Sequence, residues 1–170
     1  MAPPPPPPQT IITAFGLDSQ APAPITTGLH NRTFLVHQGG ERRILQLLNP
    51  IFRPEVNEDI EVVTEHLAAA GLETPLLVRT LAGDTWCKDE DGGVWRVLTH
   101  VEGETVEQVN SPARAREAGG LLGRFHAALL SLDYAFKHRR AGVHDTRTHL
   151  ENLNTALDDP DRPAWSSYFF

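Results

Sequence analysis

The sequence predicts an α+β fold in which an antiparallel sheet comes first and helices follow it. Short apolar runs are separated by tight turns at Gly39-Gly40, Gly83-Asp84 and Asp91-Gly92-Gly93, and turns this short join antiparallel strands. A helical repeat over residues 54–70 interrupts these runs, and a longer one over residues 112–132 follows them. The order therefore indicates a sheet that carries one helix, then a largely helical region.

The first two strands are expected to form a hairpin. Thr33 to Val36 gives one strand and Arg43 to Leu48 the other, with Gly39-Gly40 as the turn between them. Gly-Gly is a frequent hairpin turn because both central residues need a positive φ. Asn49-Pro50 should end the second strand, since a residue before proline is restricted and proline offers no N–H.

Three helices and three further strands complete the pattern. The helix from Pro54 to Ala70 carries an apolar stripe at Val56, Ile60, Val63 and Leu67, with Gly71 as its C-terminal cap. Strands are expected at residues 76–81, 85–88 and 94–101. Ser111 and Pro112 suit the start of a long helix that runs to Leu132. A last helix is predicted from Thr146 to Leu157, where Leu150, Leu153 and Leu157 share a face.

Composition excludes several classes of protein. The 170-residue chain has a formal net charge of −7, and its 15 basic residues are scattered. A nucleic-acid surface or an anionic-membrane surface would need clustered positive charge. No apolar run approaches a membrane span, the N-terminal residues do not predict a secretory signal, and Cys87 is the only cysteine. We therefore expect a cytoplasmic protein; the oligomeric state stays open.

The N-terminal residues 1–10 are expected to form a disordered, proline-rich tail. Pro3 to Pro8 is an unbroken proline run that should adopt an exposed polyproline II conformation. Such a segment can bind an SH3- or WW-type domain, but no flanking charge pattern supports that use here. A solvated tail is the favoured interpretation.

Local motifs add a resemblance to this order of elements. The run from Gly28 to Val36 resembles the glycine loop and second strand of the aminoglycoside phosphotransferase superfamily, which has a kinase-like fold. The runs 44–49, 57–67, 118–126 and 143–146 look like the branch that includes N-acetylhexosamine 1-kinase. The likeness covers about residues 10–157. It implies a protein-kinase-like N-terminal lobe over residues 11–102 and the truncated start of a helical C-terminal lobe over residues 103–170.

The resemblance also implies where a nucleotide would bind. Gly28, Asn31 and Thr33 fall in the glycine loop, and Thr99, His100 and Val101 fall at the hinge that would meet the adenine. Kinases place a lysine on the third strand, paired with a glutamate of the next helix. Gln46 stands at that position here, and Glu61 or Glu65 is the candidate helix partner. Each assignment has an alternative. The loop at Gly28 could be a plain entry to the hairpin, and Thr99 to Val101 could be an ordinary strand end. Glu61 and Glu65 could be solvated residues of the helix surface.

The catalytic part of the superfamily pattern is not found. Its H-G-D-x-x-x-x-N loop has no match, because His144-Asp145 lacks the intervening glycine and Leu150 stands where asparagine is needed. No catalytic base or metal ligand can therefore be named. His138, His144 and His149 do not have the spacing of a zinc site. ATP and Mg²⁺ are expected for a complete enzyme, and this chain alone is predicted to be inactive.

Three functional hypotheses follow. The first is an N-terminal part of an ATP-dependent kinase of a small hydroxylated metabolite, with an N-acetylhexosamine as the acceptor that the branch suggests. The second is a non-catalytic module that binds a nucleotide or a protein. The third is a non-functional fragment, in which the apolar face of the 115–132 helix would be exposed and would promote aggregation.

Overall fold

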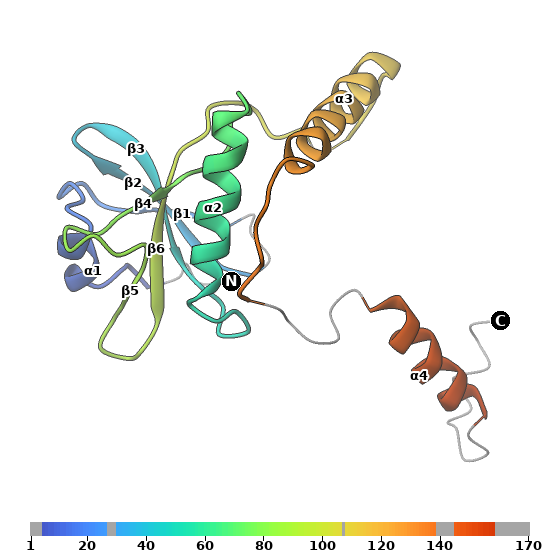
Figure 1. Cartoon of the computed structure of the whole chain (residues 1–170). Helices are drawn as coiled ribbons and strands as arrows, with labels where there is room; N and C mark the ends of the chain where they lie inside the picture. The colour runs from blue at the N-terminus through green and yellow to red at the C-terminus, as the bar shows by residue number, and fades with distance from the viewer. Residues whose placement is uncertain (1–4, 27–29, 107, 139–144, 159–170) are drawn as a thin grey trace. The chain divides into compact units, whose positions relative to one another are not determined.

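The computed structural model describes residues 5–26, 30–106, 108–138 and 145–158. It contains two compact units, residues 1–138 and 139–170, and each is described by itself. In chain order, the first unit (Figure 1) holds α1 (Gln9–Ala14), β1 (Ala23–Ile25), β2 (Arg32–Gln38), β3 (Glu41–Leu47), α2 (Val56–Ala69), β4 (Leu77–Val78), β5 (Cys87–Lys88), β6 (Val94–Thr99) and α3 (Pro112–Leu129). The second holds α4 (Thr146–Asp158).

The predicted α+β architecture with an antiparallel sheet is confirmed. The strands follow the order β1-β2-β3-β6-β4, and β5 also pairs with β6. The strands expected at 76–81 and 85–88 are only two residues each. The chain leaves the sheet after Val78 because Thr80 N–H bonds to the Asp84 carbonyl and Leu81 N–H bonds to the Ala14 carbonyl. The first bond closes a turn and the second ties Leu81 to the end of α1, where the prediction placed the end of a strand.

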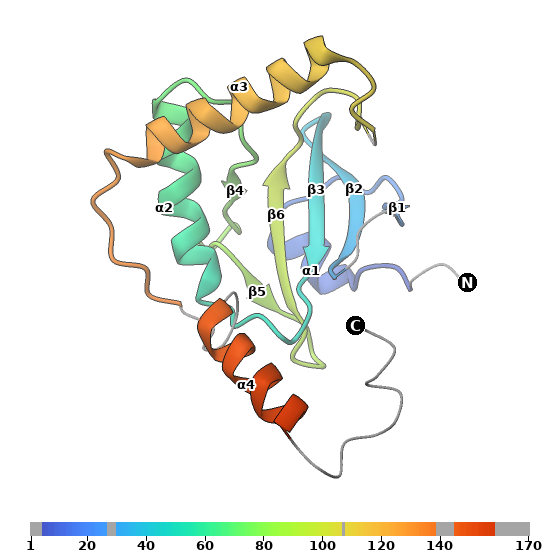
Figure 2. The same ribbon diagram turned by 90° about the vertical axis from the view of Figure 1, so that its right-hand side faces the viewer.

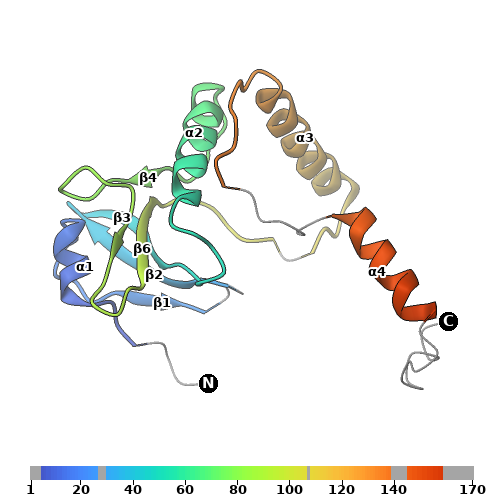
Figure 3. The same ribbon diagram turned by 60° about the horizontal axis from the view of Figure 1, so that its bottom comes forward.

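Two short helices lie on opposite faces of the sheet. Figures 1 and 3 show α1 on one side and α2 on the other. The hydrophobic core forms on the α1 side, where Ile11 and Phe15 pack with buried residues of three strands: Phe34, Val36, Leu45, Trp95 and Val97. Burial of these large side chains is the main stabilising contribution of this layer. The opposite face is left for α2 and for the polar residues described below.

The expected N-terminal tail is ordered at its end, which corrects part of the prediction for residues 1–10. Helix α1 begins at Gln9, and Pro7 is buried rather than exposed. The Pro8 carbonyl accepts hydrogen bonds from the N–H groups of Ile11 and Ile12. Burial of Ile11 and Ile12 in the core anchors this segment, which local composition alone did not indicate.

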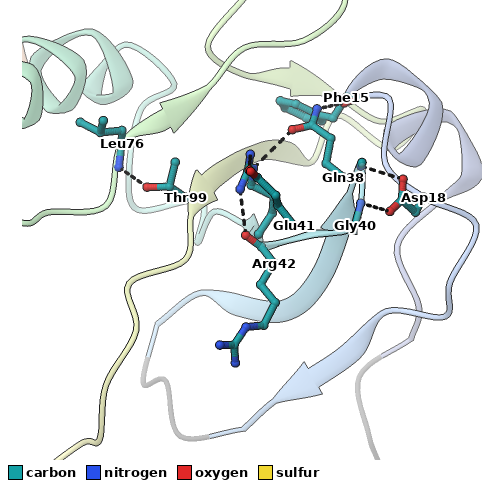
Figure 4. A network of polar contacts seen from close by, with 10 residues as sticks. Phe15, Asp18, Gln38, Gly40, Glu41, Arg42, Leu76 and Thr99 are labelled. Carbon is teal, nitrogen blue, oxygen red and sulfur yellow. Dashed lines mark hydrogen bonds and ion pairs between the residues drawn. The ribbon is translucent and has the colours of Figure 1, made fainter.

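The predicted Gly39-Gly40 turn is confirmed and is held from outside the hairpin. Both glycines have a positive φ, of 60° and 82°. The Asp18 carboxylate accepts a hydrogen bond from each glycine N–H at 3.0 Å, and these bonds hold the pKa of Asp18 below its ordinary value. Gln38 Nε2 next to the turn donates to the Phe15 carbonyl at 2.7 Å (Figure 4). The turn is therefore tied to the α1 layer.

Helix α2 begins later than predicted and has two buried polar residues. Its N-cap is Glu55 rather than a residue before Pro54, and no side chain caps it. Of the predicted stripe, Leu67 is buried while Val56, Ile60 and Val63 are half-buried. Asn57 and Asp59 are the buried polar side chains. Both are in the first turn, so this end of α2 is held by polar contacts as well as by apolar packing.

Helix α3 begins as predicted, with Pro112 in its first turn and Ser111 Oγ accepting a hydrogen bond from Arg114 N–H. It lies against the C-terminal end of α2 (Figure 2), where His66 Nε2 is 2.9 Å from the Ala128 carbonyl oxygen. Leu121 and Leu122 are 54% and 55% exposed. The predicted exposure of an apolar face on this helix is therefore confirmed.

Helix α4 in the second unit is capped by Asp145, whose carboxylate accepts hydrogen bonds from the N–H and hydroxyl of Thr148 at 3.1 and 2.9 Å. These bonds hold the pKa of Asp145 below its ordinary value. Asp145 thus has a structural role; His144 lies outside the described residues. None of the described helices is long and apolar enough to cross a membrane.

Candidate functional site

A row of polar side chains crosses the sheet on the face that α2 covers. Thr33 of β2 is directly opposite Gln46 of β3, and Gln46 is directly opposite Arg96 of β6. Gln46 Nε2 is 3.4 Å from Thr33 Oγ1, while Gln46 Oε1 accepts hydrogen bonds from Arg96 Nε at 3.0 Å and Nη2 at 2.8 Å. Successive side chains of a strand point to opposite faces of the sheet. Thr33, Gln46 and Arg96 therefore lie on the other face from the buried Phe34, Leu45 and Trp95.

Asn57 of α2 joins this row to the helix. Arg96 Nη1 donates to Asn57 Oδ1 at 3.0 Å, and Asn57 Nδ2 donates to the Pro54 carbonyl at 2.8 Å. Because arginine is only a donor, both amides must turn their oxygens toward it. Asn57 is fully buried. The arginine is consequently fixed by two neutral amides, one on each side.

Arg96 is a half-buried cation without an ion-pair partner among the described residues. Burial lowers its pKa, because the charged form loses hydration. Its neighbour Asn57 is in the first turn of α2, and a helix N-terminus carries a partial positive charge that disfavours a cation. The surroundings therefore favour an anion next to this guanidinium.

The connection between β1 and β2 is attached to the end of β3. Asn31 Oδ1 accepts a hydrogen bond from Asn49 N–H at 3.0 Å, and Asn49 Nδ2 donates to the His30 carbonyl at 3.3 Å. Asn31 was predicted to bind the nucleotide. In the structure its side chain ties the start of β2 to the residues that follow β3. Gly28, the predicted glycine-loop residue, lies outside the described residues.

The predicted hinge residues follow one another at the end of β6. Thr99 Oγ1 accepts a hydrogen bond from Leu76 N–H at 2.9 Å, and Thr99 N–H bonds to the Leu76 carbonyl at 2.8 Å (Figure 4). His100 Nδ1 lies 3.3 Å from Glu102 Oε1, without the alignment of a hydrogen bond. Val101 is exposed. Thr99 therefore holds the β4 edge of the sheet through its side chain.

The two glutamates predicted to face Gln46 do not join its hydrogen bonds. Glu61 Oε1 pairs with Arg79 Nη2 at 2.6 Å, and Glu65 is exposed. The residue of α2 that reaches the row is Asn57, one turn before Glu61. Nothing in the sequence around Asn57 predicted its contact with Arg96. The signal for Arg96 was a single arginine within the apolar strand Val94–Thr99, and sequence reasoning did not use it.

The chain matches the profile of the phosphotransferase enzyme family over residues 22–167. It belongs to this family. The match covers most of the sequence, including the polar row on the sheet and the three longest helices. The predicted kinship to the aminoglycoside phosphotransferases is thereby confirmed at the level of the family. The narrower likeness to the N-acetylhexosamine 1-kinase branch stays a proposal.

Solved structures of three phosphotransferases share the fold. An amicoumacin kinase in complex with AMP-PNP, Ca²⁺ and Ami superposes with a TM-score of 0.66 at 18% identity, over 88% of this chain and 48% of that one. A spectinomycin phosphotransferase in complex with ADP and spectinomycin gives 0.53 at 12% identity, over 95% and 49%. A putative aminoglycoside phosphotransferase from Ralstonia eutropha JMP134 gives 0.52 at 17%, over 85% and 45%. The chain thus spans about half the length of these structures.

The described residues contain no cluster of side chains that could hold a divalent metal by itself. Among them, no group of three or more histidine, cysteine, aspartate or glutamate side chains could hold an ion. The most buried carboxylate, Asp59, is instead bonded to Tyr134, Lys137 and His138. This part of the molecule therefore provides no complete metal site of its own.

Proposed function

We propose that this chain forms the nucleotide-binding part of an ATP-dependent phosphotransferase that acts on a hydroxyl group of a small metabolite. The observation that supports this most is the row from Thr33 through Gln46 to Arg96. In this row, amide and hydroxyl groups surround a cation that has no ion-pair partner among the described residues. Kinase-like enzymes bind the nucleotide phosphates under this part of the sheet.

The nucleotide would lie along the α2-facing side of the sheet. Its phosphates would lie near Thr33 and Gln46, with Asn31, just before β2, close to them. Its adenine would meet the backbone at Thr99, His100 and Val101. Gly28 belongs to the proposed site by its sequence resemblance and lies outside the described residues. The hollow of about 330 Å³ at the end of β3 is lined by other residues, among them His30, Arg32 and Phe52, and has no place in this proposal.

The acceptor is proposed from the sequence resemblance alone. An N-acetylhexosamine offers a hydroxyl that could receive the γ-phosphoryl group, and in-line transfer would need Mg²⁺ and a base near that hydroxyl. The described residues provide neither. We therefore expect nucleotide binding without phosphoryl transfer from this chain by itself.

Calorimetric titration of the 170-residue chain with ATP, together with amide hydrogen exchange, tests the nucleotide site. We expect saturable binding and slower exchange in two segments, residues 30–33 and 99–101. Adding N-acetylglucosamine and radiolabelled ATP should give no sugar phosphate. Absence of ATP binding would refute the proposed site. Sugar phosphate formation would show that the catalytic groups are present after all.

A non-catalytic binding module is the second candidate, and one observation favours it. Gln46 stands where kinases carry a lysine, so the usual ion pair with a glutamate of the next helix cannot form. Under this hypothesis the chain binds ATP without hydrolysing it or transferring its phosphoryl group. The same should hold for a longer protein expressed from the same gene. Turnover by that longer protein would exclude the module interpretation.

A further inference from the structure

We infer that Arg96 of β6 supplies the cation that contacts the nucleotide phosphates, with Gln46 and Asn57 as the residues that position it. This inference rests on the proposed function, because it assigns a role within the same nucleotide site. The positive charge that kinases place on the third strand would here come from the neighbouring strand, directly opposite the same position.

The first argument is the register of the sheet. Gln46 and Arg96 are directly opposite residues of β3 and β6, so an arginine at 96 brings its guanidinium to the side chain at 46. A lysine at position 46 would face this guanidinium at hydrogen-bond distance, and like charges placed opposite each other destabilise a sheet. Glutamine removes the repulsion and accepts two hydrogen bonds instead. Gln46 therefore fits a site whose cation is Arg96.

The second argument is the unbalanced charge. Arg43 is the other half-buried arginine among the described residues, and it pairs with Glu41. Arg96 is held by amide oxygens only, in a half-buried position near the start of α2. A desolvated cation is costly to hold without an opposite charge. An anionic ligand would offset that cost.

The third argument is geometric. A guanidinium has five N–H groups, and the contacts to Gln46 and Asn57 use three of them. The two others remain to bind phosphate oxygens, and arginine suits this use because its planar fork matches phosphate geometry. Asn57 is fully buried and bonded at both ends of its amide. The guanidinium is thus preorganised, and little side-chain freedom remains to be lost on binding.

The experiment compares three probes without divalent metal: ATP, adenosine and inorganic tripolyphosphate. Adenosine reports the adenine pocket, and tripolyphosphate reports the anion site. Gln46→Glu is the main variant, because it keeps the shape of the side chain and neutralises Arg96 by an ion pair. We expect it to fold and to lose about tenfold or more in affinity for ATP and tripolyphosphate, the effect of a charge-assisted hydrogen bond. Adenosine binding should be unchanged.

Arg96→Gln should show the same pattern by removing the cation. Arg43→Gln is the matched control: it removes one charge from β3, but its side chain bonds to Gln38 and Glu41 rather than to the row. It should bind all three probes as the wild type does. If Arg96→Gln does not fold, as shown by circular dichroism, Gln46→Glu alone decides.

The outcomes separate this inference from the proposed function. Unchanged ATP and tripolyphosphate affinities in folded Gln46→Glu and Arg96→Gln would overturn the role of Arg96 and leave the nucleotide site standing. Tripolyphosphate binding that depends on Arg96, without any adenosine binding by the wild type, would support the anion site and refute the nucleotide function. Failure of the wild type to bind any of the three probes would overturn both.

Discussion

Replacement of Asp59 by asparagine should detach the segment that follows α3. The Asp59 side chain is 5% exposed. Its Oδ1 accepts hydrogen bonds from the Tyr134 hydroxyl at 2.7 Å and from Lys137 N–H at 3.0 Å, and its Oδ2 accepts one from His138 N–H at 2.9 Å. Asparagine has the same shape, but its NH₂ group cannot accept. One backbone N–H is then left without a partner.

The cost of this change is estimated from the hydrogen bonds. A donor left unsatisfied costs about 1–3 kcal/mol, and two bonds that lose their charged acceptor each weaken by about 1 kcal/mol. We therefore expect the docking of residues 133–138 to weaken by at least about 3 kcal/mol, the lower end of this sum. The loss is local, because this segment follows α3 and contributes nothing to the core beneath α1.

Amide hydrogen exchange measures the effect directly. The amides of Lys137 and His138 should exchange about a hundredfold faster in Asp59→Asn, since every 1.4 kcal/mol is tenfold. Glu58→Gln is the matched control: its partner is the exposed Lys137 ammonium at 2.7 Å, and exposed ion pairs contribute little. Equal protection of the two amides in Asp59→Asn and in the wild type would refute the reasoning.

The pH dependence gives an independent check. Burial by itself would raise the pKa of Asp59, but the hydrogen bonds from Lys137, Tyr134 and His138 hold it below its ordinary value. The stabilisation is therefore complete above about pH 3.9, the pKa of a free aspartate, and is lost as the pH falls through the lower pKa of the docked state. The wild type and Asp59→Asn should converge under acid.

Ionisation of the Tyr134 hydroxyl gives a second measure of its hydrogen bond to Asp59. Its hydrogen bond to Asp59 is the main cause that raises the pKa of the Tyr134 hydroxyl. In Asp59→Asn one of the two tyrosines of the chain should therefore ionise at lower pH than in the wild type. Ultraviolet difference titration measures this, and identical titration curves would contradict the assigned contact.

Three other predictions concern single sites. Gly93→Ala should destabilise the chain by about 1–3 kcal/mol in urea unfolding, because the new Cβ would lie 2.6 Å from Asp89 Oδ2. The same change at Gly119 meets no atom within 4 Å inside α3 and should stabilise by about 0.5–1 kcal/mol; destabilisation there would contradict the reasoning. Burial, together with nearby aspartates, raises the pKa of Cys87 to about 11. Its thiol should therefore react with a disulfide reagent at pH 8 far more slowly in the folded chain than in urea, and equal rates would refute this burial.

Features that depend on neighbours in the chain were predicted well. The Gly39-Gly40 turn, the cap formed by Ser111 and Pro112, and the helix that follows it are where the sequence placed them. Each has a local signal in the residue types, namely glycines that adopt a positive φ and a serine that caps the helix, although the turn is also held from outside by Asp18. The length of the strand expected at residues 76–81 was overestimated, because the N–H groups of Thr80 and Leu81 bond to Asp84 and Ala14 rather than to a neighbouring strand.

The polar site depends on hydrogen bonds between residues far apart in the chain, for which the sequence contains no signal. Gln46 and Arg96 are 50 residues apart, and Arg96 and Asn57 are 39 apart. The sequence by itself determined the α+β class, the position of Gln46 on the third strand and the likeness to a phosphotransferase. Only the tertiary structure decided which cation stands beside Gln46, because the register of β3 against β6 and the packing of α2 on the sheet fix that contact. These are long-range arrangements, and they form when the sheet folds as a whole.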